Sequence, residues 1–334
     1  MKNVKYLILI ACIPYHIYSQ SNTYPYTKKS VVIDTYFDAQ VEDSYRWLEN
    51  DKDKNVRNWI NIQNEFTNSY LEQIPYRESI KNRLEELWNY EKISTPFKEG
   101  DYTYFYKNNG LQNQSVLYRK QGNGKEEIFL NPNEFSKDGT ISLRGLSFTE
   151  DGSIVAYSIS EGGSDWRKVI IMESKTKQIL EDTLHNIKFS GINWHGNEGF
   201  YYSSYDKPEN SILSDKNDNH KLYYHKLGTS QKNDQVVFGE KENERFRYVS
   251  GYITKDKRYL IISVAKETSG NNLFIKDKES NNSELIQITE DFKSNSYIIH
   301  NINSQLFIVT NLDAPNKKVI TVDIEDPTPN NWKD

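Results

Sequence analysis

Three glycine–serine segments are the places where this sequence could carry a serine nucleophile. A nucleophile of the α/β-hydrolase type needs Gly-x-Ser-x-Gly, which holds the serine on a tight turn between a strand and a helix. The segment around Ser164 has Trp166 where the last glycine is required, and the segment around Ser230 has Lys232 there. The third serine, Ser153, follows a turn glycine and lacks the spacing. We therefore expect no catalytic residue in this sequence.

The histidines form no metal-binding pattern. His220 and His225 are five residues apart on a predicted strand, so they face opposite sides of it. The sequence has no His-Glu-x-x-His segment and a single cysteine, and its glycines occur singly or in turns rather than in a phosphate-binding loop. We interpret the histidines as surface or strand-packing residues and expect neither a metal nor a cofactor. They are His16, His185, His195, His220, His225 and His300.

Composition limits the classes of partner. The 334 residues would make one large domain or two of ordinary size. The formal net charge is −5 and the pI is about 5.8, with both signs mixed along the chain. These values do not favour a nucleic-acid-binding protein. The 24 tyrosines and 14 phenylalanines suit strands that pack as sheets.

A repeated layout of strand, polar turn and strand organises most of the chain. Successive copies begin about 45 to 60 residues apart, which is typical of four-stranded propeller blades. An ordinary β-sandwich is the alternative. We therefore predict a mainly β fold, an incomplete β-propeller with about five blades. The predicted strand pairs are residues 101–107 with 115–120, 153–158 with 168–174, 199–204 with 221–227, 258–264 with 272–277, and 305–311 with 318–324.

The first 19 residues have the layout of a secretory signal. Lys2 and Lys5 precede an apolar run that is too short to span a bilayer, and Ser19 provides a small residue before a possible cleavage point. We predict cleavage near Ser19, export to the periplasm and no transmembrane segment. The alternative is a lipoprotein signal, with a lipid anchor on Cys12. In either case the mature protein has no disulfide, because Cys12 is the only cysteine.

Residues 20–92 differ in pattern from the rest of the chain and are predicted to form a two-helix arm. Pro75 separates two amphipathic runs, each with one apolar face that needs a partner surface. We place the start of the strand-rich part at residue 93 and its extent at 93–334. A polar insertion at residues 206–219 is interpreted as a surface loop. The apolar faces are Val56, Trp59, Ile60, Phe66 and Tyr70 in the first run, and Ile80, Leu84, Leu87 and Trp88 in the second.

Several short segments together resemble the prolyl oligopeptidase (prolyl endopeptidase) family, the serine peptidases that cleave short peptides after proline. The resemblance covers about residues 26–332. It is carried by DSYRWLE at 43–49, NGLQNQ at 109–114 with VLY at 116–118, FLNPN at 129–133, DGT at 138–140, LRG at 143–145, GSDW at 163–166, KFS at 188–190 with Trp194, and KLYYH at 221–225 with LGT at 227–229.

The resemblance implies an architecture and a set of contact residues. In the family the helical arm packs on the α/β-hydrolase domain, a seven-bladed propeller comes next, and the rest of the hydrolase domain, with its triad, comes last. That domain is therefore expected to be absent from residues 1–334. Phe189, Tyr248 and Thr268 fall where apolar propeller side chains border the substrate pocket. Asp165 matches an acid that holds a substrate-binding arginine of the hydrolase domain.

Two functions from different classes are consistent with these residues. The first is the propeller portion of a prolyl oligopeptidase-like endopeptidase, cut short before its triad, in which the propeller gates and helps bind short proline-containing peptides. Its partner would be the missing hydrolase domain. The alternative is a non-catalytic binding protein built on an open propeller, in which the apolar arm and a sheet edge would stay uncovered.

Overall fold

The computed structural model describes residues 23–206, 217–280 and 284–334. The chain divides into two compact units, Met1–Ser79 and Ile80–Asp334, which are described separately. The predicted signal segment, with Cys12, and most of the predicted loop at 206–219 lie outside the described residues. No helix of the described ranges is long and apolar enough to cross a bilayer.

The first unit contains a hairpin that the sequence pattern did not reveal. Strands β1 (Val32–Tyr36) and β2 (Ala39–Asp43) pair in antiparallel register around Phe37 and Asp38, whose φ values of 46° and 69° are those of a tight hairpin turn. Behind it, the guanidinium of Arg46 in the short helix η1 (Arg46–Glu49) forms ion pairs with Asp34 and Asp43. The hairpin is therefore tied to the segment that leads into the first helix.

The two predicted helices form as α1 (Lys54–Glu72) and α2 (Arg77–Trp88), and the boundary between the two units falls within α2. The Asp53 carboxylate caps α1 by accepting a hydrogen bond from the Asn55 backbone N–H at 2.7 Å. Of the α1 residues only Val56 is buried, and no residue of α2 is. Leu84 and Trp88 remain 57% and 63% exposed. Within the described residues both apolar faces are thus largely uncovered.

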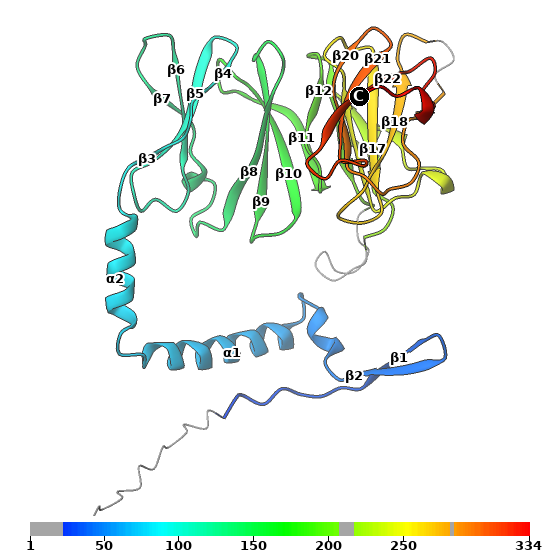
Figure 1. The fold of residues 1–334 in the computed structure, drawn as a ribbon. Helices are drawn as coiled ribbons and strands as arrows, with labels where there is room; N and C mark the ends of the chain where they lie inside the picture. Colours follow the sequence, from blue (N-terminus) through cyan, green and yellow to red (C-terminus); the bar gives the residue numbers. More distant parts are fainter. Residues whose placement is uncertain (1–22, 207–216, 281–283) are drawn as a thin grey trace, which may run out of the picture. The chain divides into compact units, whose positions relative to one another are not determined.

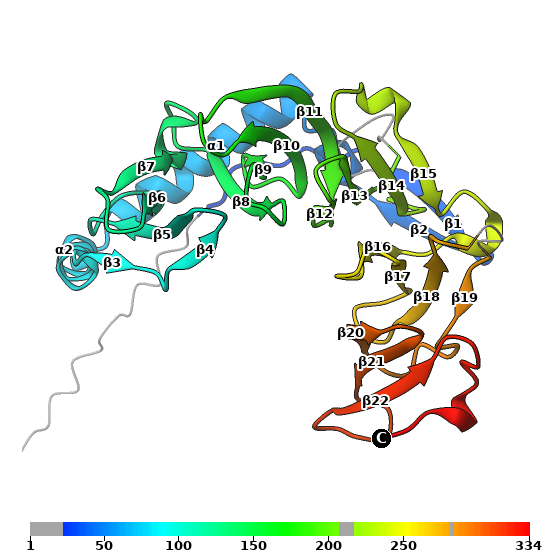
Figure 2. The same ribbon diagram turned by 90° about the horizontal axis from the view of Figure 1, so that it is seen from above.

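The second unit consists of five antiparallel sheets, numbered here in chain order (Figures 1 and 2). Sheet 1 contains β3 (Lys92–Ile93), β4 (Phe97–Glu99), β5 (Tyr102–Asn108), β6 (Val116–Gln121) and β7 (Glu127–Leu130). Sheet 2 contains β8 (Ile141–Phe148), β9 (Ile154–Glu161), β10 (Trp166–Glu173) and β11 (Ile179–Lys188). Sheet 3 contains β12 (Asn193–His195), β13 (Gly199–Ser204), β14 (Lys221–Lys226) and β15 (Gln235–Phe238).

The last two sheets have the same plan. Sheet 4 contains β16 (Tyr248–Ile253), β17 (Tyr259–Ala265), β18 (Asn272–Asp277) and β19 (Ile286–Gln287). Sheet 5 contains β20 (Ser296–Ile302), β21 (Gln305–Thr310) and β22 (Lys318–Asp323), with a single bridge from Thr321 to Lys333 on its outer side. In sheets 2 to 5 each strand pairs with the next in sequence, which is the meander of a propeller blade.

The hydrophobic core lies between successive sheets. One cluster joins Leu117 of sheet 1 to Tyr157 of sheet 2, and the next joins Ile171 of sheet 2 to Phe200 of sheet 3. Equivalent clusters lie between sheets 3 and 4 and between sheets 4 and 5, and we call each of these four interfaces between sheets a seam. Neighbouring residues of one central strand therefore pack against the sheets on its two opposite faces. This explains why β13 is buried along its whole length. A two-sheet sandwich would have one such core, so this arrangement supports the propeller interpretation.

A buried arginine links sheet 1 to sheet 2 at the first seam. Arg119 on β6 is 2% exposed, and its guanidinium lies 4.2 Å from the ring centre of Tyr102. It donates hydrogen bonds to the Ser174 and Lys175 carbonyl oxygens of sheet 2, the second at 3.1 Å, and pairs with Glu127 at 2.6 Å. Sheet 2 is thus held to sheet 1 by a charged group as well as by apolar packing.

The predicted strand pairs coincide with β5–β6, β9–β10, β13–β14, β17–β18 and β21–β22, within a few residues at each end. The mainly β prediction is confirmed. The flanking strands, among them β11, β12, β16 and β19, were not predicted. These strands are short or carry polar residues on one face, so their pattern resembles that of the loops beside them.

Candidate functional site

An aromatic ledge forms where Phe189 leaves sheet 2 and Tyr248 enters sheet 4. Phe189 directly follows β11, with φ at 52° in the left-handed region, and its side chain is 44% exposed. Its ring meets that of Tyr248, the first residue of β16, edge-on at 5.9 Å between centroids. The buried Tyr205 ring contacts Phe189 from another side at 6.3 Å. A left-handed backbone is unfavourable for a bulky side chain, so the surrounding fold must offset this local conformational energy to keep the ring in its exposed position.

His220 connects the two segments that carry the ledge. Its side chain is 1% exposed, with Nε2 3.0 Å from the Lys188 carbonyl oxygen and Nδ1 2.9 Å from the Val249 backbone nitrogen. Nδ1 must accept from Val249 N–H, so Nε2 carries the hydrogen and donates to Lys188. The neutral tautomer is thereby selected, and burial lowers the pKa of His220 to about 4. Tyr205 stacks on this imidazole at 4.4 Å.

Cationic groups surround the ledge. The Lys188 ammonium lies 5.2 Å from the Phe189 ring centre, and the Arg247 guanidinium lies 5.5 Å from that of Tyr248. The Tyr205 hydroxyl donates to the Arg247 carbonyl oxygen at 2.6 Å, and burial raises the pKa of Tyr205 to about 12. The ledge borders a cavity of about 810 Å³. Its lining consists of Lys188, Phe189, Tyr205, Asn217, Asp218, Asn219, Arg245, Phe246, Arg247 and Tyr248.

Asp165 lies in the turn between β9 and β10 and is exposed. The β10–β11 register ends with Trp166 opposite Lys188, so Asp165 directly precedes and Phe189 directly follows the last pair of this ladder. The Lys188 ammonium over the Trp166 ring, at 5.1 Å, strengthens this end of the sheet. The structure therefore puts the predicted acid and the predicted aromatic contact at the same end of the same strand pair.

Thr268 occupies a different position from the other predicted contacts. It lies exposed in the bend between β17 and β18, three residues beyond Ala265, the register partner of Tyr248. It does not line the ledge cavity. Phe189 and Tyr248 are thus brought together, and Asp165 lies at the same end of the β10–β11 strand pair as Phe189, whereas Thr268 does not line the cavity.

Sequence reasoning missed the supports of the ledge. Tyr205, His220 and Arg247 lie on separate strands or loops, and no local spacing links them to Phe189. Of the two roles expected for His220, surface or strand packing, the structure assigns the second. His225 contacts Asp234 at 2.7 Å instead, away from His220. Among the residues that the structure describes, no group of three or more His, Cys, Asp or Glu side chains could hold a metal ion.

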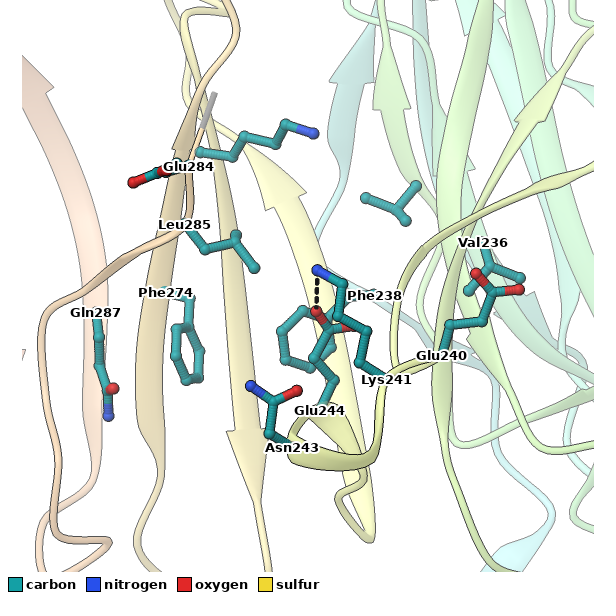
Figure 3. Close-up of a pocket in the computed structure, with 12 residues that line it drawn as sticks. Val236, Phe238, Glu240, Lys241, Asn243, Glu244, Phe274, Glu284, Leu285 and Gln287 are labelled. Atoms are coloured by element: carbon teal, nitrogen blue, oxygen red, sulfur yellow. Dashed lines mark ion pairs between the residues drawn. The ribbon is translucent and has the colours of Figure 1, made fainter. Parts of the chain in front are cut away.

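A separate crevice lies between sheets 3 and 4, beside β15 and β19 (Figure 3). The rings of Phe238 and Phe274, 5.6 Å apart, form its apolar floor, and Lys241 pairs with Glu244 at 3.2 Å. Its lining mixes three carboxylates and two ammonium groups and includes none of the predicted contact residues. It is lined by Val236, Val237, Phe238, Glu240, Lys241, Asn243, Glu244, Phe274, Lys276, Glu284, Leu285 and Gln287.

Successive four-stranded meanders with their core between the sheets define a propeller-type protein, and comparison with known proteins gives the family. Residues 24–334 match the model of the prolyl oligopeptidase N-terminal β-propeller domain, so the chain belongs to the prolyl oligopeptidase family. The prolyl endopeptidase of Elizabethkingia miricola is 50% identical over 339 residues, which are all of this chain and 48% of that protein. That of Elizabethkingia meningoseptica is 49% identical with the same coverage.

Solved structures agree. A structure from a study of two prolyl endopeptidases superposes with a TM-score of 0.81 at 26% identity, over 93% of this chain and 46% of that one. Prolyl oligopeptidase B from Galerina marginata, bound to a 35mer hydrolysis and macrocyclization substrate, gives 0.79 at 28% identity, over 94% and 48%. The chain spans about half the length of the curated relatives it matches.

Proposed function

We propose that this chain is the propeller portion of a serine endopeptidase that cleaves short peptides on the carboxyl side of proline. Family membership supports the reaction class, and the ledge supports a direct role of the propeller in holding the peptide. The observation that carries this second part is Phe189, which is half exposed on a left-handed backbone and supported by two tyrosine rings.

The ledge would bind an apolar or proline side chain of the substrate. Aromatic faces bury large apolar areas and lose little conformational entropy, because Tyr205 and Tyr248 already restrict the Phe189 ring. Covering the exposed part of one phenylalanine ring is worth on the order of 1 kcal/mol, or several-fold in affinity. His220 keeps the two halves of the ledge in register through the Lys188 and Val249 backbones.

Asp165 is proposed to orient an arginine of the hydrolase domain of the complete peptidase. A carboxylate accepts two parallel hydrogen bonds from a guanidinium, which fixes the plane of that group beside the peptide backbone. The exposure of Asp165 leaves its carboxylate open to such a partner. Its place at the same end of the β10–β11 strand pair as Phe189 would put backbone binding and side-chain binding on nearby parts of one peptide.

A chimera tests the proposal. The matching half of the Elizabethkingia miricola prolyl endopeptidase would be replaced by this chain, and hydrolysis of a fluorogenic peptide with proline before the cleaved bond would be measured. We expect a folded chimera to cleave after proline and not after alanine in the same peptide. A folded chimera with no such activity, beside an active parent enzyme, would contradict the proposed function.

We also propose that the protein is exported to the periplasm by residues 1–19, with a lipid anchor on Cys12 as the alternative. The basic and apolar layout of this segment supports export. Expression of the natural gene with Cys12→Ser, followed by separation of membranes from periplasm, distinguishes the two forms. If the natural protein and Cys12→Ser are both found in the periplasmic fraction, the soluble form is supported. If only Cys12→Ser is released from the membrane fraction, the lipid anchor is supported.

A further inference from the structure

A small crevice with an unusual charge lies beside β8, β9 and β10 of sheet 2 and the segment that leads from β11 to sheet 3. Its volume is about 290 Å³, enough for one side chain or one chain terminus rather than a large cofactor. It is lined by Arg144, Gly145, Leu146, Ser147, Ala156, Ser158, Arg167, Val169, Ile187, Ser190, Gly191 and Ile192. The lining contains two arginines and no carboxylate, although the chain as a whole has a net charge of −5.

One of the two guanidinium groups has an unused donor. The Nε of Arg167 is buried and has no hydrogen-bond partner in the described part of the chain. A buried donor of a charged group that lacks an acceptor is energetically unfavourable, so such groups are rare unless something binds them. Arg144 is exposed at the mouth of the crevice. Together they present a positive wall with an unsatisfied donor inside it.

The sheet geometry explains why both arginines face one space. The β8–β9 register shifts between Leu143 and Gly145, so Arg144 is the extra residue of a bulge, and bulges re-aim side chains. On the other side, Arg167 pairs with Ser160 and Val169 pairs with Ser158, which places Arg167 on the face of β10 that packs toward sheet 3.

The floor of the crevice is open because residue 145 is glycine. A Cβ at that position would lie 2.9 Å from the Ser158 hydroxyl oxygen, closer than real Cβ contacts come. Two other hydroxyls of the lining are occupied, because Ser147 donates to the Ile192 carbonyl oxygen and Ser190 to that of Gly191. The polar side chains of the lining that remain for a ligand are the two guanidinium groups and Ser158.

We propose that this crevice binds a carboxylate of a peptide, held by the Arg144 and Arg167 guanidinium groups above the Ser158 hydroxyl. Guanidinium groups match carboxylates in planar, bidentate geometry, and a hydroxyl supplies a further donor. The carboxylate comes either from an acidic side chain or from a free C-terminus. Ser190 and Gly191 of the crevice directly follow Phe189, so the ledge and the crevice meet on one segment. That the peptide is a substrate rests on the proposed function, whereas carboxylate binding does not.

The test is arginine-detected NMR on the whole chain. The Nε–H signal of Arg167, assigned by its loss in Arg167→Gln, would be followed during titration with acetate and, separately, with acetamide. Two blocked peptides that differ only as Glu or Gln, and a third with a free C-terminus, would then identify the source of the carboxylate. We expect a saturable shift with acetate, none with acetamide, and about tenfold tighter binding of one carboxylate peptide than of the Gln peptide.

Matched variants locate the site. Arg144 is exposed, so Arg144→Gln should fold normally, and it should weaken carboxylate binding about tenfold. Arg57→Gln, at an exposed position of α1 that lines neither cavity, should leave it unchanged. Ser158→Ala is a second variant in case Arg167→Gln fails to fold. Equal affinity for the Glu and Gln peptides, a signal that responds only to inorganic phosphate, or equal effects of Arg144→Gln and Arg57→Gln would overturn the proposal. An inactive chimera with intact acetate binding would refute only the peptidase function.

Discussion

Replacing His220 should destabilise the chain by an amount that depends on pH. His220→Phe keeps an aromatic ring against Tyr205 but leaves the Lys188 carbonyl and the Val249 N–H buried without partners. At about 1 to 3 kcal/mol for each of the two groups, we expect a loss of roughly 2 to 6 kcal/mol of unfolding free energy near pH 7. His185→Phe, at an exposed histidine of β11, is the matched control and should cost within about 0.5 kcal/mol.

Acid should shrink that difference. The pKa of folded His220 is about 4, below the ordinary 6.5, so between these values the unfolded chain binds a proton that the folded chain does not. The contribution of the neutral imidazole is therefore complete above pH 6.5 and declines as pH falls toward 4. A shift of the His220 pKa from 6.5 to about 4 corresponds to about 3 kcal/mol of unfolding free energy. The cost of His220→Phe should accordingly fall by about 2 to 3 kcal/mol between pH 7 and roughly pH 4.5.

The assay is urea unfolding of the chain and both variants, followed by tryptophan fluorescence at several pH values. Equal denaturant slopes would show that the compared states are the same. A cost of His220→Phe that stays constant from neutral to acid pH would refute the neutral state assigned to the buried imidazole. A cost below about 0.5 kcal/mol would refute the claim that His220 holds the two strands together.

Three further outcomes are expected. In the chimera, Phe189→Ala should raise the KM for proline peptides several-fold with little change in kcat, because a ring that covers the substrate stabilises the ground state and the transition state equally. An unchanged KM would show that Phe189 does not contact the substrate. Asp165→Asn should lower kcat/KM by about tenfold or more through loss of charge-assisted pairing, and activity equal to that of the parent would argue against an arginine partner. Arg119→Met should cost about 3 to 5 kcal/mol of unfolding free energy, because it leaves the Ser174 and Lys175 carbonyl groups without a donor. Glu127→Gln should cost at most about 1 kcal/mol, because that carboxylate is 47% exposed. Equal costs of the two substitutions would contradict the importance of the contacts between Arg119 and these carbonyl groups.

The central strands of the blades were predictable from sequence for a physical reason. Strands such as β9 and β17 bury both faces, so they are continuous runs of apolar and aromatic residues that end at turn residues. The outer strand β11 alternates buried and exposed positions and carries polar residues such as Asp182 and His185. The strand β19 has only two residues. Neither gives a signal that exceeds that of a polar loop.

The site was predictable only in part. Phe189, Tyr248 and Asp165 came from the resemblance to a family, and the structure places the first two in contact and the third at the same end of the β10–β11 strand pair as Phe189. Their support by His220 depends on three strands that are distant in the sequence, and no local pattern encodes it. The crevice of Arg144 depends on a bulge, and a one-residue register shift has no sequence signature of its own.

The most direct test of the ledge is photo-crosslinking. A short proline peptide with a benzophenone side chain next to its proline would be irradiated with the chain, and the attached residues would be mapped by mass spectrometry. The account predicts attachment at residues 188–190 and 247–248, competition by an unlabelled proline peptide, and loss of labelling in Phe189→Ala. Labelling spread over the other blades, or unchanged in Phe189→Ala, would contradict the claim that this ledge holds the peptide.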